Sequence, residues 1–327
     1  MKAIVYTKYG PPEVLHLEEV KKPALNEDQV LVKVYTASIN ASDWHLLTAD
    51  PFPLRLMGVG LFKPKNTILG VDIAGCVEAV GRNVQQFRPG DEVFGDIYGY
   101  GSGSFAEYVS VPESTLALKP SNVSFEEAAA VPVAAVTALQ GLHNQGQIQH
   151  GQKVLINGAS GGVGTFAVQI AKAFGAEVTA VCSTQNLEMA RLIGADYVID
   201  YTKEDFTKNG QQYDFILAVS GYHPLSAYKR ALTPRGIYSF VGGLPAQTLQ
   251  AMLLGPLMSK RDGKKMTSVM KKANQKDLLF IRDLLKDGKI RPVIDECYPL
   301  SETAKAFRYF GKGHARSKVI ITITAKE

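Results

Sequence analysis

The sequence predicts an α/β protein that combines a mainly β domain with a doubly wound parallel sheet. Three observations support this fold class. Residues 1–120 are strand-like and rich in turns, strands and helices alternate between about residues 124 and 270, and a glycine-rich turn joins a strand to a helix inside that region. Strands that alternate with helices are typical of a parallel sheet with crossover helices.

The first region reads as strands separated by turns. Gln29-Val30-Leu31-Val32-Lys33-Val34-Tyr35 alternates as a half-buried strand does, and residues 72–80 and 106–111 are further strand candidates. Turn signals lie between them, including Arg88-Pro89-Gly90-Asp91 and the glycine cluster at residues 99–103. This part of the chain is therefore predicted to be mainly β.

The alternating region begins at Ser124, which is suited to cap a helix with an acidic first turn. Residues 128–142 read as a helix that Pro132 interrupts. Apolar runs then predict strands at residues 154–157, 177–182, 197–199, 215–219, 236–241 and 265–270, and helices at residues 164–174, 187–193 and 225–231. After residue 273 the pattern changes again, to helices at residues 278–285 and 302–310, the latter opened by Ser301, an extended segment at 292–300 and a strand at 318–324.

The glycine-rich turn is the most specific local pattern. It follows the apolar run Lys153–Asn157, has the spacing Ala159-x-Gly161-x-x-Gly164 and opens an apolar helix. This geometry presents backbone N–H groups and a helix N-terminus to a pyrophosphate. It predicts a dinucleotide site made by Ala159, Ser160, Gly161, Gly162, Val163 and Gly164. The alternative is a tight turn that only packs the helix on the sheet.

Bulk properties narrow the class of protein. A chain of 327 residues suggests about two domains, and 46% hydrophobic with 20% charged residues is an ordinary globular composition. The net charge of +5 fits anionic ligands better than a dedicated nucleic-acid protein. Three scattered cysteines and a strand-like N-terminus predict a reducing, cytoplasmic setting, and no apolar stretch is long enough to span a membrane.

Four segments in a familiar order carry a family resemblance. They are Pro89-Gly90-Asp91-Glu92-Val93-Phe94-Gly95, Phe105-Ala106-Glu107-Tyr108-Val109, the glycine turn, and Gly194-Ala195-Asp196-Tyr197-Val198-Ile199-Asp200-Tyr201. Over essentially the whole chain this order resembles the medium-chain dehydrogenase/reductase superfamily, and most closely its zinc-free quinone oxidoreductase branch. The resemblance implies a GroES-like catalytic domain from residues 1–124 and 273–327, with a Rossmann domain at 125–272. It also implies an active site in the cleft and a homodimer paired through the edge strand at residues 265–270.

The sequence departs from the zinc pattern of that superfamily. Asn40-Ala41-Ser42-Asp43 stands where the first zinc ligand would be, and Gly70-Val71-Asp72 stands where a Gly-His-Glu would be. Neither an amide nor a valine is a reasonable zinc ligand, so no metal is expected. Reduction of a quinone or an activated enone then needs less assistance than oxidation of an ordinary alcohol.

The expected cofactor is NADPH, with NADH still possible. The second strand ends in Val181-Cys182-Ser183-Thr184, without the acid that usually binds the ribose of NAD, and Ser183 can donate to a phosphate. Gln185 stands where a relative often has Lys or Arg, which weakens the argument for a phosphate. The alternative for Ser183 and Thr184 is that they cap the following helix and do nothing more. The resemblance places Tyr201 at the adenosine end; the alternative is a surface tyrosine.

The resemblance also assigns residues to the reacting end. Asn40, Trp44 and His45 line the nicotinamide and substrate side, with Asn40 bonding a carboxamide or ribose hydroxyl, Trp44 forming a wall and His45 donating a proton. The alternatives are an asparagine that bonds its own backbone, a tryptophan that packs in the core, and a satisfied or exposed histidine. Further cofactor contacts are expected from Thr137, Ser220, Gly242, Arg316 and Lys318. Thr137 could instead bond its own helix, and the two basic residues could simply be exposed.

The predicted function is hydride transfer from NADPH to a quinone or activated enone without zinc. One alternative is an NADPH-binding interaction protein with weak catalysis, suggested by the basic stretch at residues 259–276. Such a stretch could touch nucleic acid or a membrane, but solvated loops beside an edge strand are the preferred interpretation, so neither contact is expected. Another alternative is a metal-free aldehyde or ketone reductase.

Overall fold

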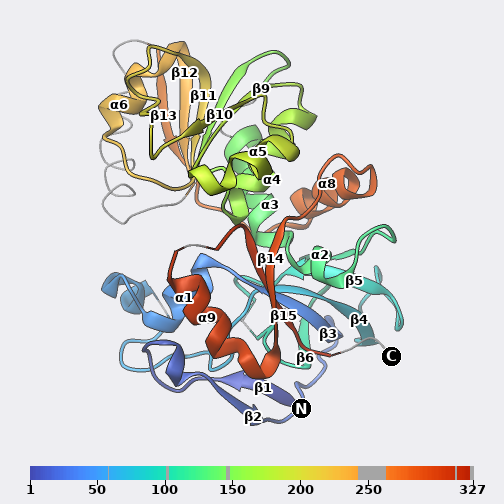
Figure 1. The fold of residues 1–327 in the computed structure, drawn as a ribbon. Coiled ribbons are helices and arrows are strands. Elements are labelled where there is room, and N and C mark those ends of the chain that lie inside the picture. The colour runs from blue at the N-terminus through green and yellow to red at the C-terminus, as the bar shows by residue number, and fades with distance from the viewer. Residues whose placement is uncertain (58, 101–102, 145–147, 242–262, 314, 325–327) are drawn as a thin grey trace. The chain divides into compact units, whose positions relative to one another are not determined.

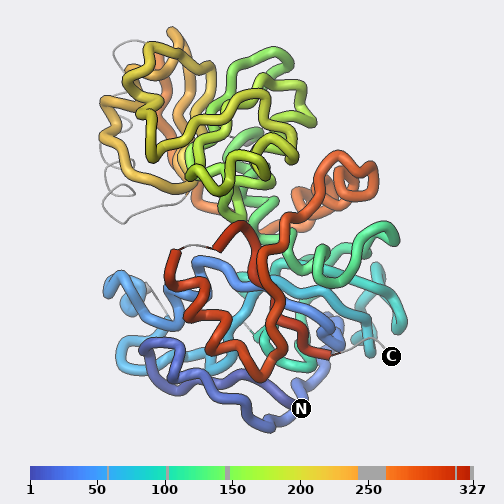
Figure 2. Tube along the Cα trace, viewed as in Figure 1, coloured from blue at the N-terminus to red at the C-terminus, as the bar shows by residue number. Residues whose placement is uncertain are grey.

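The computed structural model describes residues 1–327 except 58, 101–102, 145–147, 242–262, 314 and 325–327. The chain forms two compact units. The first unit contains Met1–Val133, Ala273–Lys286 and Pro292–Glu327, and the second contains Ala134–Lys272 and Asp287–Arg291. In Figure 2 the first unit combines blue and red tube, because both ends of the sequence contribute to it.

The first unit is built on a seven-stranded sheet with the order β14-β15-β3-β4-β5-β7, and β6 also pairs with β3 (Figure 1). The strands are β3 (Gln29–Ile39), β4 (Asp72–Val80), β5 (Glu92–Asp96), β6 (Tyr108–Pro112), β7 (Leu116–Leu118), β14 (Ile294–Pro299) and β15 (Lys318–Thr322). A separate antiparallel pair joins β1 (Lys2–Val5) to β2 (His16–Glu19). The prediction of a mainly β first region is confirmed.

Helices and short turns connect these strands. The α-helices of the first unit are α1 (Ala41–Thr48), α2 (Phe125–Ala129), α8 (Gln275–Lys286) and α9 (Thr303–Gly311). Short 3₁₀ turns cover Pro12–Val14, Phe52–Met57, Glu113–Thr115 and Leu300–Glu302. One core cluster gathers apolar residues from both ends of the sequence, including Ile39, Leu47, Phe105, Phe307 and Val319. The C-terminal segment is therefore part of the core of the first unit.

The second unit is a six-stranded sheet in which every ladder is parallel. Its order is β10-β9-β8-β11-β12-β13, with β8 (Lys153–Asn157), β9 (Glu177–Cys182), β10 (Tyr197–Asp200), β11 (Tyr213–Ala218), β12 (Leu232–Phe240) and β13 (Lys265–Ser268). This is the order of a doubly wound dinucleotide-binding sheet, whose direction of winding reverses between β8 and β11. The predicted sixth strand is confirmed as β13, at the edge.

The second unit carries α3 (Pro132–Leu139), which starts at its boundary, α4 (Gly162–Ala173), α5 (Leu187–Leu192) and α6 (Leu225–Arg230). A π-helical turn covers Gln140–Asn144, and a 3₁₀ turn covers Thr184–Asn186. No helix in the described part of the chain has the length and apolar character needed to cross a membrane.

Two predicted helix starts had different outcomes. Ser124 caps α2 as expected, because its hydroxyl accepts the Glu127 N–H while the Glu127 carboxylate accepts the Ser124 N–H. The prediction that Ser301 opens the last helix is wrong. Ser301 lies inside a 3₁₀ turn, and α9 begins at Thr303, whose hydroxyl donates back to the Leu300 carbonyl.

Candidate functional site

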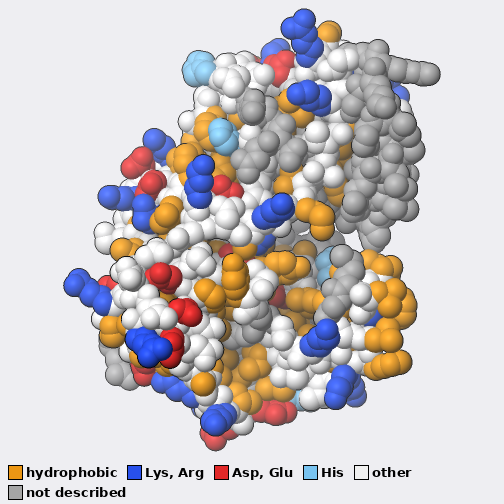
Figure 3. Space-filling view, turned by 180° about the vertical axis from the view of Figure 1, so that it is seen from behind, with side chains coloured by type: hydrophobic (Ala, Val, Ile, Leu, Met, Phe, Trp, Pro, Cys, Tyr) orange, Lys and Arg blue, Asp and Glu red, His pale blue; other side chains and the backbone are white. Residues whose placement is uncertain are grey.

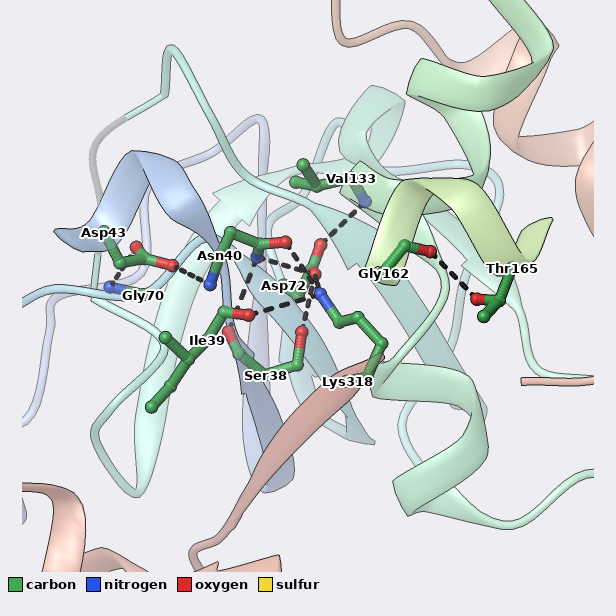
Figure 4. Close-up of polar contacts among 10 residues, drawn as sticks. All are labelled: Ser38, Ile39, Asn40, Asp43, Gly70, Asp72, Val133, Gly162, Thr165 and Lys318. Carbon is green, nitrogen blue, oxygen red and sulfur yellow. Dashed lines mark hydrogen bonds and ion pairs between the residues drawn. The ribbon is translucent and has the colours of Figure 1, made fainter. Parts of the chain in front are cut away.

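The register of three neighbouring strands gathers polar side chains in the first unit. β3 ends at Ile39, which is paired with Val319 of β15, while Ser38 is paired with Asp72 of β4. Lys318 and Asp72 are the first residues of their strands, so both lie beside the end of β3 and the start of α1 (Figure 4). We call Ser38, Asn40, Asp72 and Lys318 the strand-end cluster.

Asp72 is the centre of the strand-end cluster. One carboxylate oxygen, Oδ2, accepts hydrogen bonds from Ser38 Oγ at 2.7 Å and Asn40 Nδ2 at 2.8 Å, and Lys318 Nζ lies 3.3 Å from it. The other oxygen accepts the Val133 N–H at 2.9 Å, in the first turn of α3, where helix N–H groups lack internal acceptors. Asp72 is fully buried. Its negative charge is therefore compensated by protein groups alone.

Lys318 completes the cluster from the opposite end of the sequence. Its ammonium donates to Asn40 Oδ1 at 2.7 Å and to the Ile39 carbonyl at 3.4 Å, besides its ion pair with Asp72. Only 3% of the Lys318 side chain is exposed. The interpretation of Lys318 as an exposed base is therefore wrong, because the antiparallel pairing of β15 with β3 places it inside the sheet.

A second carboxylate lies one turn away, in α1. Asp43 accepts the Asn40 N–H at 2.8 Å and the Gly70 N–H at 3.2 Å, and it is fully buried. Burial raises the pKa of Asp43 to about 7, although both N–H donors and the Lys318 charge act in the opposite direction. Asp43 therefore fixes the junction between β3 and α1 at the position of Asn40.

The other two residues predicted at the reacting end have clear surroundings. Trp44 is half-buried against a core cluster, and a Cβ added at Gly311 of α9 would lie 2.2 Å from its ring, so the ring packs directly on that glycine. The contact of Trp44 with α9 therefore agrees with the core-packing alternative for this residue. His45 is exposed, and its Nδ1 lies 2.6 Å from the Asp50 carbonyl.

The glycine turn in the second unit has the geometry of a phosphate cradle. Gly158 adopts a positive φ of 89°, and a Cβ at Gly164 would lie 2.1 Å from the Gly158 carbonyl oxygen, so helix and turn are in closest contact there. Among the described residues, a Cβ at Gly161, the N-cap of α4, would meet a single atom, the Gly158 carbonyl oxygen at 3.8 Å. The backbone at Gly161 is thus open to close approach by a ligand, and the first N–H groups of α4 face the same end.

Ser183 and Thr184 follow β9, the strand whose Val181 carbonyl accepts the N–H groups of Gly158 and Ala159 in the cradle. Ser183 does not cap the following turn; instead its hydroxyl oxygen accepts a bond from Asn186 Nδ2 at 3.1 Å. Thr184 donates its hydroxyl to Asp200, the last residue of the neighbouring strand β10. The capping alternative for these two residues is therefore wrong, since both hydroxyls make other contacts.

The sequence pattern did not predict a carboxylate at this position, where the structure places Asp200. Hydrogen bonds from Thr184, and then from Thr202, lower the pKa of Asp200 to about 2, and Lys203 Nζ lies 3.6 Å away. The acid expected about twenty residues after a glycine turn is absent from β9, but the parallel pairing of β10 with β9 supplies one from the next strand.

The remaining predicted cofactor residues lie on several elements. Thr137 is buried in α3, whereas Tyr201 is 61% exposed directly after β10, as the surface alternative expected. Ser220 is exposed after β11, and its N–H donates to the Asn157 carbonyl at 3.2 Å. Arg316 is exposed, and its N–H donates to Asp295 Oδ2. Gly242 lies outside the described residues.

The basic stretch at residues 259–276 is described from Gly263 onward. Lys264 donates to the Lys229 carbonyl, and Lys265 is exposed on the edge strand β13. On the face drawn in Figure 3, Lys and Arg side chains are scattered rather than gathered in one patch. The described residues of this stretch, from Gly263 onward, therefore agree with the interpretation as solvated positions beside an edge strand.

The residues at the zinc-ligand positions do not fit a metal. Asn40 uses its amide in contacts with Lys318 and Asp72, and Val71 is an apolar side chain that is 1% exposed in a core cluster. Among the described residues, no group of three or more His, Cys, Asp or Glu side chains is placed to hold a metal ion. Asn40 lies beside the ion pair of Lys318 and Asp72, where a zinc member of the superfamily would have a metal ligand.

Sequence reasoning missed Asp72 and Ser38 as members of the cluster. A local signal exists: Asp72 and Lys318 are opposite charges that each open a mostly apolar strand. Buried charges are usually paired, so two such strand ends indicate partners. What the pattern does not contain is the register that brings residues 246 positions apart into contact.

Comparisons with known proteins agree with this architecture. Two family models match, the alcohol dehydrogenase GroES-like domain over residues 26–121 and the zinc-binding dehydrogenase over residues 193–321. A 2-methylene-furan-3-one reductase of Solanum lycopersicum is 37% identical over 98% of this chain and 79% of its own length. An NADPH-dependent alkenal/one oxidoreductase of Arabidopsis thaliana is 34% identical over 98% and 79%. A solved quinone oxidoreductase of Coxiella burnetii superposes with a TM-score of 0.88, at 29% identity over 99% of both chains.

Proposed function

Because the chain belongs to the medium-chain dehydrogenase/reductase superfamily, in its quinone oxidoreductase branch, we propose that it is an NADPH-dependent reductase of activated enones or quinones that needs no metal. The observation that carries the proposal is the cradle at residues 158–164, with a helix N-terminus and a glycine backbone open to a ligand. Relatives whose names specify furanone, alkenal or quinone substrates support the choice of acceptor.

The second unit offers contacts for each part of the cofactor. The N–H groups at the start of α4 would hold the pyrophosphate, with Ala159, Ser160, Gly161, Gly162, Val163 and Gly164 forming the turn. When bound, the nicotinamide supplies a hydride. Further contacts are proposed for Thr137, Tyr201, Ser220 and Gly242 and, from the first unit, for Arg316, whereas Lys318 acts only through Asn40 because its ammonium is already engaged by protein groups.

The preference for NADPH rests on Ser183. Asn186 donates into the Ser183 oxygen, so the hydroxyl hydrogen of Ser183 is available to a 2′-phosphate. Asp200 would oppose a phosphate, but hydroxyls of Thr184 and Thr202 and the Lys203 ammonium already face its carboxylate. Lys203 would then add a cation near the same strand ends, where Gln185 supplies none.

On the substrate side we propose Asn40, Trp44 and His45. Asn40 would donate a hydrogen bond, Trp44 would present the part of its ring that Gly311 leaves uncovered, and exposed His45 is the candidate proton donor, with water as the alternative. An activated enone or a quinone accepts hydride without a Lewis acid, which agrees with the absence of suitable ligands at Asn40 and Val71.

Steady-state kinetics with a panel of acceptors test the proposal. Metal-stripped protein is expected to oxidise NADPH with at least one enone or quinone, with kcat/KM for NADPH above that for NADH. Addition of Zn²⁺ is expected to change nothing. Turnover only with simple aldehydes or ketones would favour the alternative metal-free carbonyl reductase, and the absence of turnover despite NADPH binding would favour an interaction protein.

We also propose a homodimer that pairs through the edge of the second unit's sheet. Among the described residues β13 is the last strand in the sheet order, which is the edge that the family resemblance assigns to the dimer. Light scattering after size-exclusion chromatography should give twice the mass of 35.5 kDa. Thr267→Pro, within β13, should reduce the dimer fraction if the edge is the interface.

A further inference from the structure

We propose that Lys318 and Asp72 are positioning residues that hold the Asn40 carboxamide in one orientation, so that one of its Nδ2 hydrogens is presented to an oxygen atom of the bound cofactor or acceptor. The inference deepens the proposed function, on which it rests for the role of Asn40. It is carried by the closed set of contacts in the strand-end cluster drawn in Figure 4.

The two ends of the Asn40 amide face opposite charges. Its oxygen accepts from the Lys318 ammonium at 2.7 Å, and its nitrogen donates to Asp72 Oδ2 at 2.8 Å. Rotation of the amide by half a turn would place its NH₂ group against the ammonium and its oxygen against the carboxylate. Both contacts would then be repulsive in a buried site, so the pair of charges selects one orientation.

The second amide hydrogen of Asn40 has a weak contact that a ligand would replace. The first points to Asp72, whereas among the described residues the second acceptor of the nitrogen is the Ser38 carbonyl at 3.5 Å, the limit of a hydrogen bond. The ammonium on Oδ1 polarises the amide and makes its N–H a stronger donor. Asn40 is 7% exposed, in contrast to fully buried Asp72, so it is the member of this pair with access to solvent.

Stability alone does not account for the ion pair. Removing an ammonium and a carboxylate from water is costly, and apolar residues of similar volume are often at least as stabilising in such a place. What apolar residues do not supply is a donor for Asn40 Oδ1 and an acceptor for Nδ2. The geometry therefore points to orientation of the amide as the contribution of Lys318 and Asp72.

Two variants separate positioning from charge compensation. Lys318→Met leaves Asp72 buried without its cation, and is expected to destabilise the protein and to lower kcat at least tenfold. Lys318→Met combined with Asp72→Asn removes both charges of the buried pair, so its urea midpoint should return toward wild type. If positioning is the role, kcat of this double variant stays at least tenfold low; recovery of kcat to within twofold of wild type would overturn the proposal.

Lys119 provides the matched control. It is also a buried lysine of the first unit, 5% exposed and 3.0 Å from Glu92, and it donates to the carbonyls of Pro120 and Val123. Lys119→Met is expected to lower the urea midpoint as Lys318→Met does, with kcat within twofold of wild type. An equal loss of kcat in both variants would show that kcat follows stability, which would contradict the proposal.

A measurement without turnover keeps this inference separate from the proposed function. In protein labelled with ¹⁵N-asparagine, the Asn40 side-chain signal is assigned by its loss in Asn40→Asp. Wild type should give one pair of amide signals, and the double variant should give a shifted or doubled pair, with Lys318→Arg closer to wild type. Unchanged signals in the double variant would overturn the positioning role, whereas failure of every acceptor in the panel would overturn only the enzymatic proposal.

Discussion

The strand-end cluster of the first unit and the glycine cradle of the second unit differ in where their polar groups find hydrogen-bond partners. The charges of the cluster are satisfied internally, because Asp72 and Lys318 direct them at protein groups, and only the Asn40 amide is proposed to keep a donor for a ligand. The cradle is open, because among the described residues the backbone at Gly161 has almost nothing in front of it. Buried charges must complete their own hydrogen bonds, while a backbone ligand site leaves donors for the ligand.

Two aspartates show the same contrast in their titration. Burial raises the pKa of Asp43 in the first unit to about 7, whereas the Thr184 hydroxyl and its neighbours lower the pKa of Asp200 in the second unit to about 2. Desolvation dominates at Asp43, which is fully buried in α1, and hydrogen bonding dominates at Asp200, which ends β10. We therefore expect variants at the buried carboxylates of the first unit to change the pH dependence of stability, and variants in the cradle to change stability or NADPH affinity.

The largest expected effect is the pH dependence of Asp43. Its folded pKa, about 7, lies above its ordinary value of 3.8, so the native state holds this proton more tightly than the unfolded state does. The free energy of unfolding should fall by about 4 kcal/mol as pH rises from 4 to 8 and then level off. Urea titrations of wild type and Asp43→Asn measure this, and equal pH slopes in the two proteins would contradict it.

The next effect separates two glycines of the cradle. Gly164→Ala should lower the free energy of unfolding by about 1–3 kcal/mol, because its Cβ would clash with backbone 2.1 Å away. Gly161→Ala should leave stability within about 0.5 kcal/mol but weaken NADPH binding at least tenfold, since its methyl group would occupy the open approach. Thermal unfolding and NADPH fluorescence titration are the measurements. Unchanged NADPH affinity in Gly161→Ala would mean that the ligand does not approach there.

A neutral contact in the second unit should matter less than the ionic ones. The Tyr228 hydroxyl accepts a hydrogen bond from Asn157 Nδ2 at 2.8 Å, and Asn157 ends β8 next to the cradle. Tyr228→Phe leaves that buried donor without this acceptor and should cost about 1–2 kcal/mol. Urea unfolding should show the same loss at pH 5 and pH 8, because no charge is involved. A loss that changes with pH would point to coupling with an ionisable group.

The smallest effect is expected at the cap of α2. Ser124→Ala removes the hydroxyl that accepts the Glu127 N–H and should cost about 1 kcal/mol. Ser124→Asp preserves the acceptor and serves as the matched control. If the alanine and aspartate variants unfold at the same urea concentration, the cap contributes nothing to the first unit.

Local patterns predicted the second unit better than the site of the first unit. A parallel sheet and its glycine turn follow from short repeats of apolar runs and glycine spacing, and the edge strand β13 was recognised in the same way. The prediction that Ser301 opens a helix is wrong because the chain first forms a 3₁₀ turn through Glu302. The capping alternative for Ser183 and Thr184 is wrong because Asn186 and Asp200 engage their hydroxyls. The strand-end cluster depends on register between β15, β3 and β4, and no local pattern encodes that register.

The pairing of β15 with β3 has a consequence for synthesis on the ribosome. Domains generally fold as units, starting from the N-terminal side of the nascent chain. The parallel sheet of the second unit is complete once Ser268 has emerged, but Asp72 must wait for Lys318, 246 positions later. A nascent chain would thus hold the finished sheet of the second unit while the first unit still lacks β14, β15 and the counter-charge of Asp72. Chaperones that bind unpaired strand edges would have their longest opportunity during this interval.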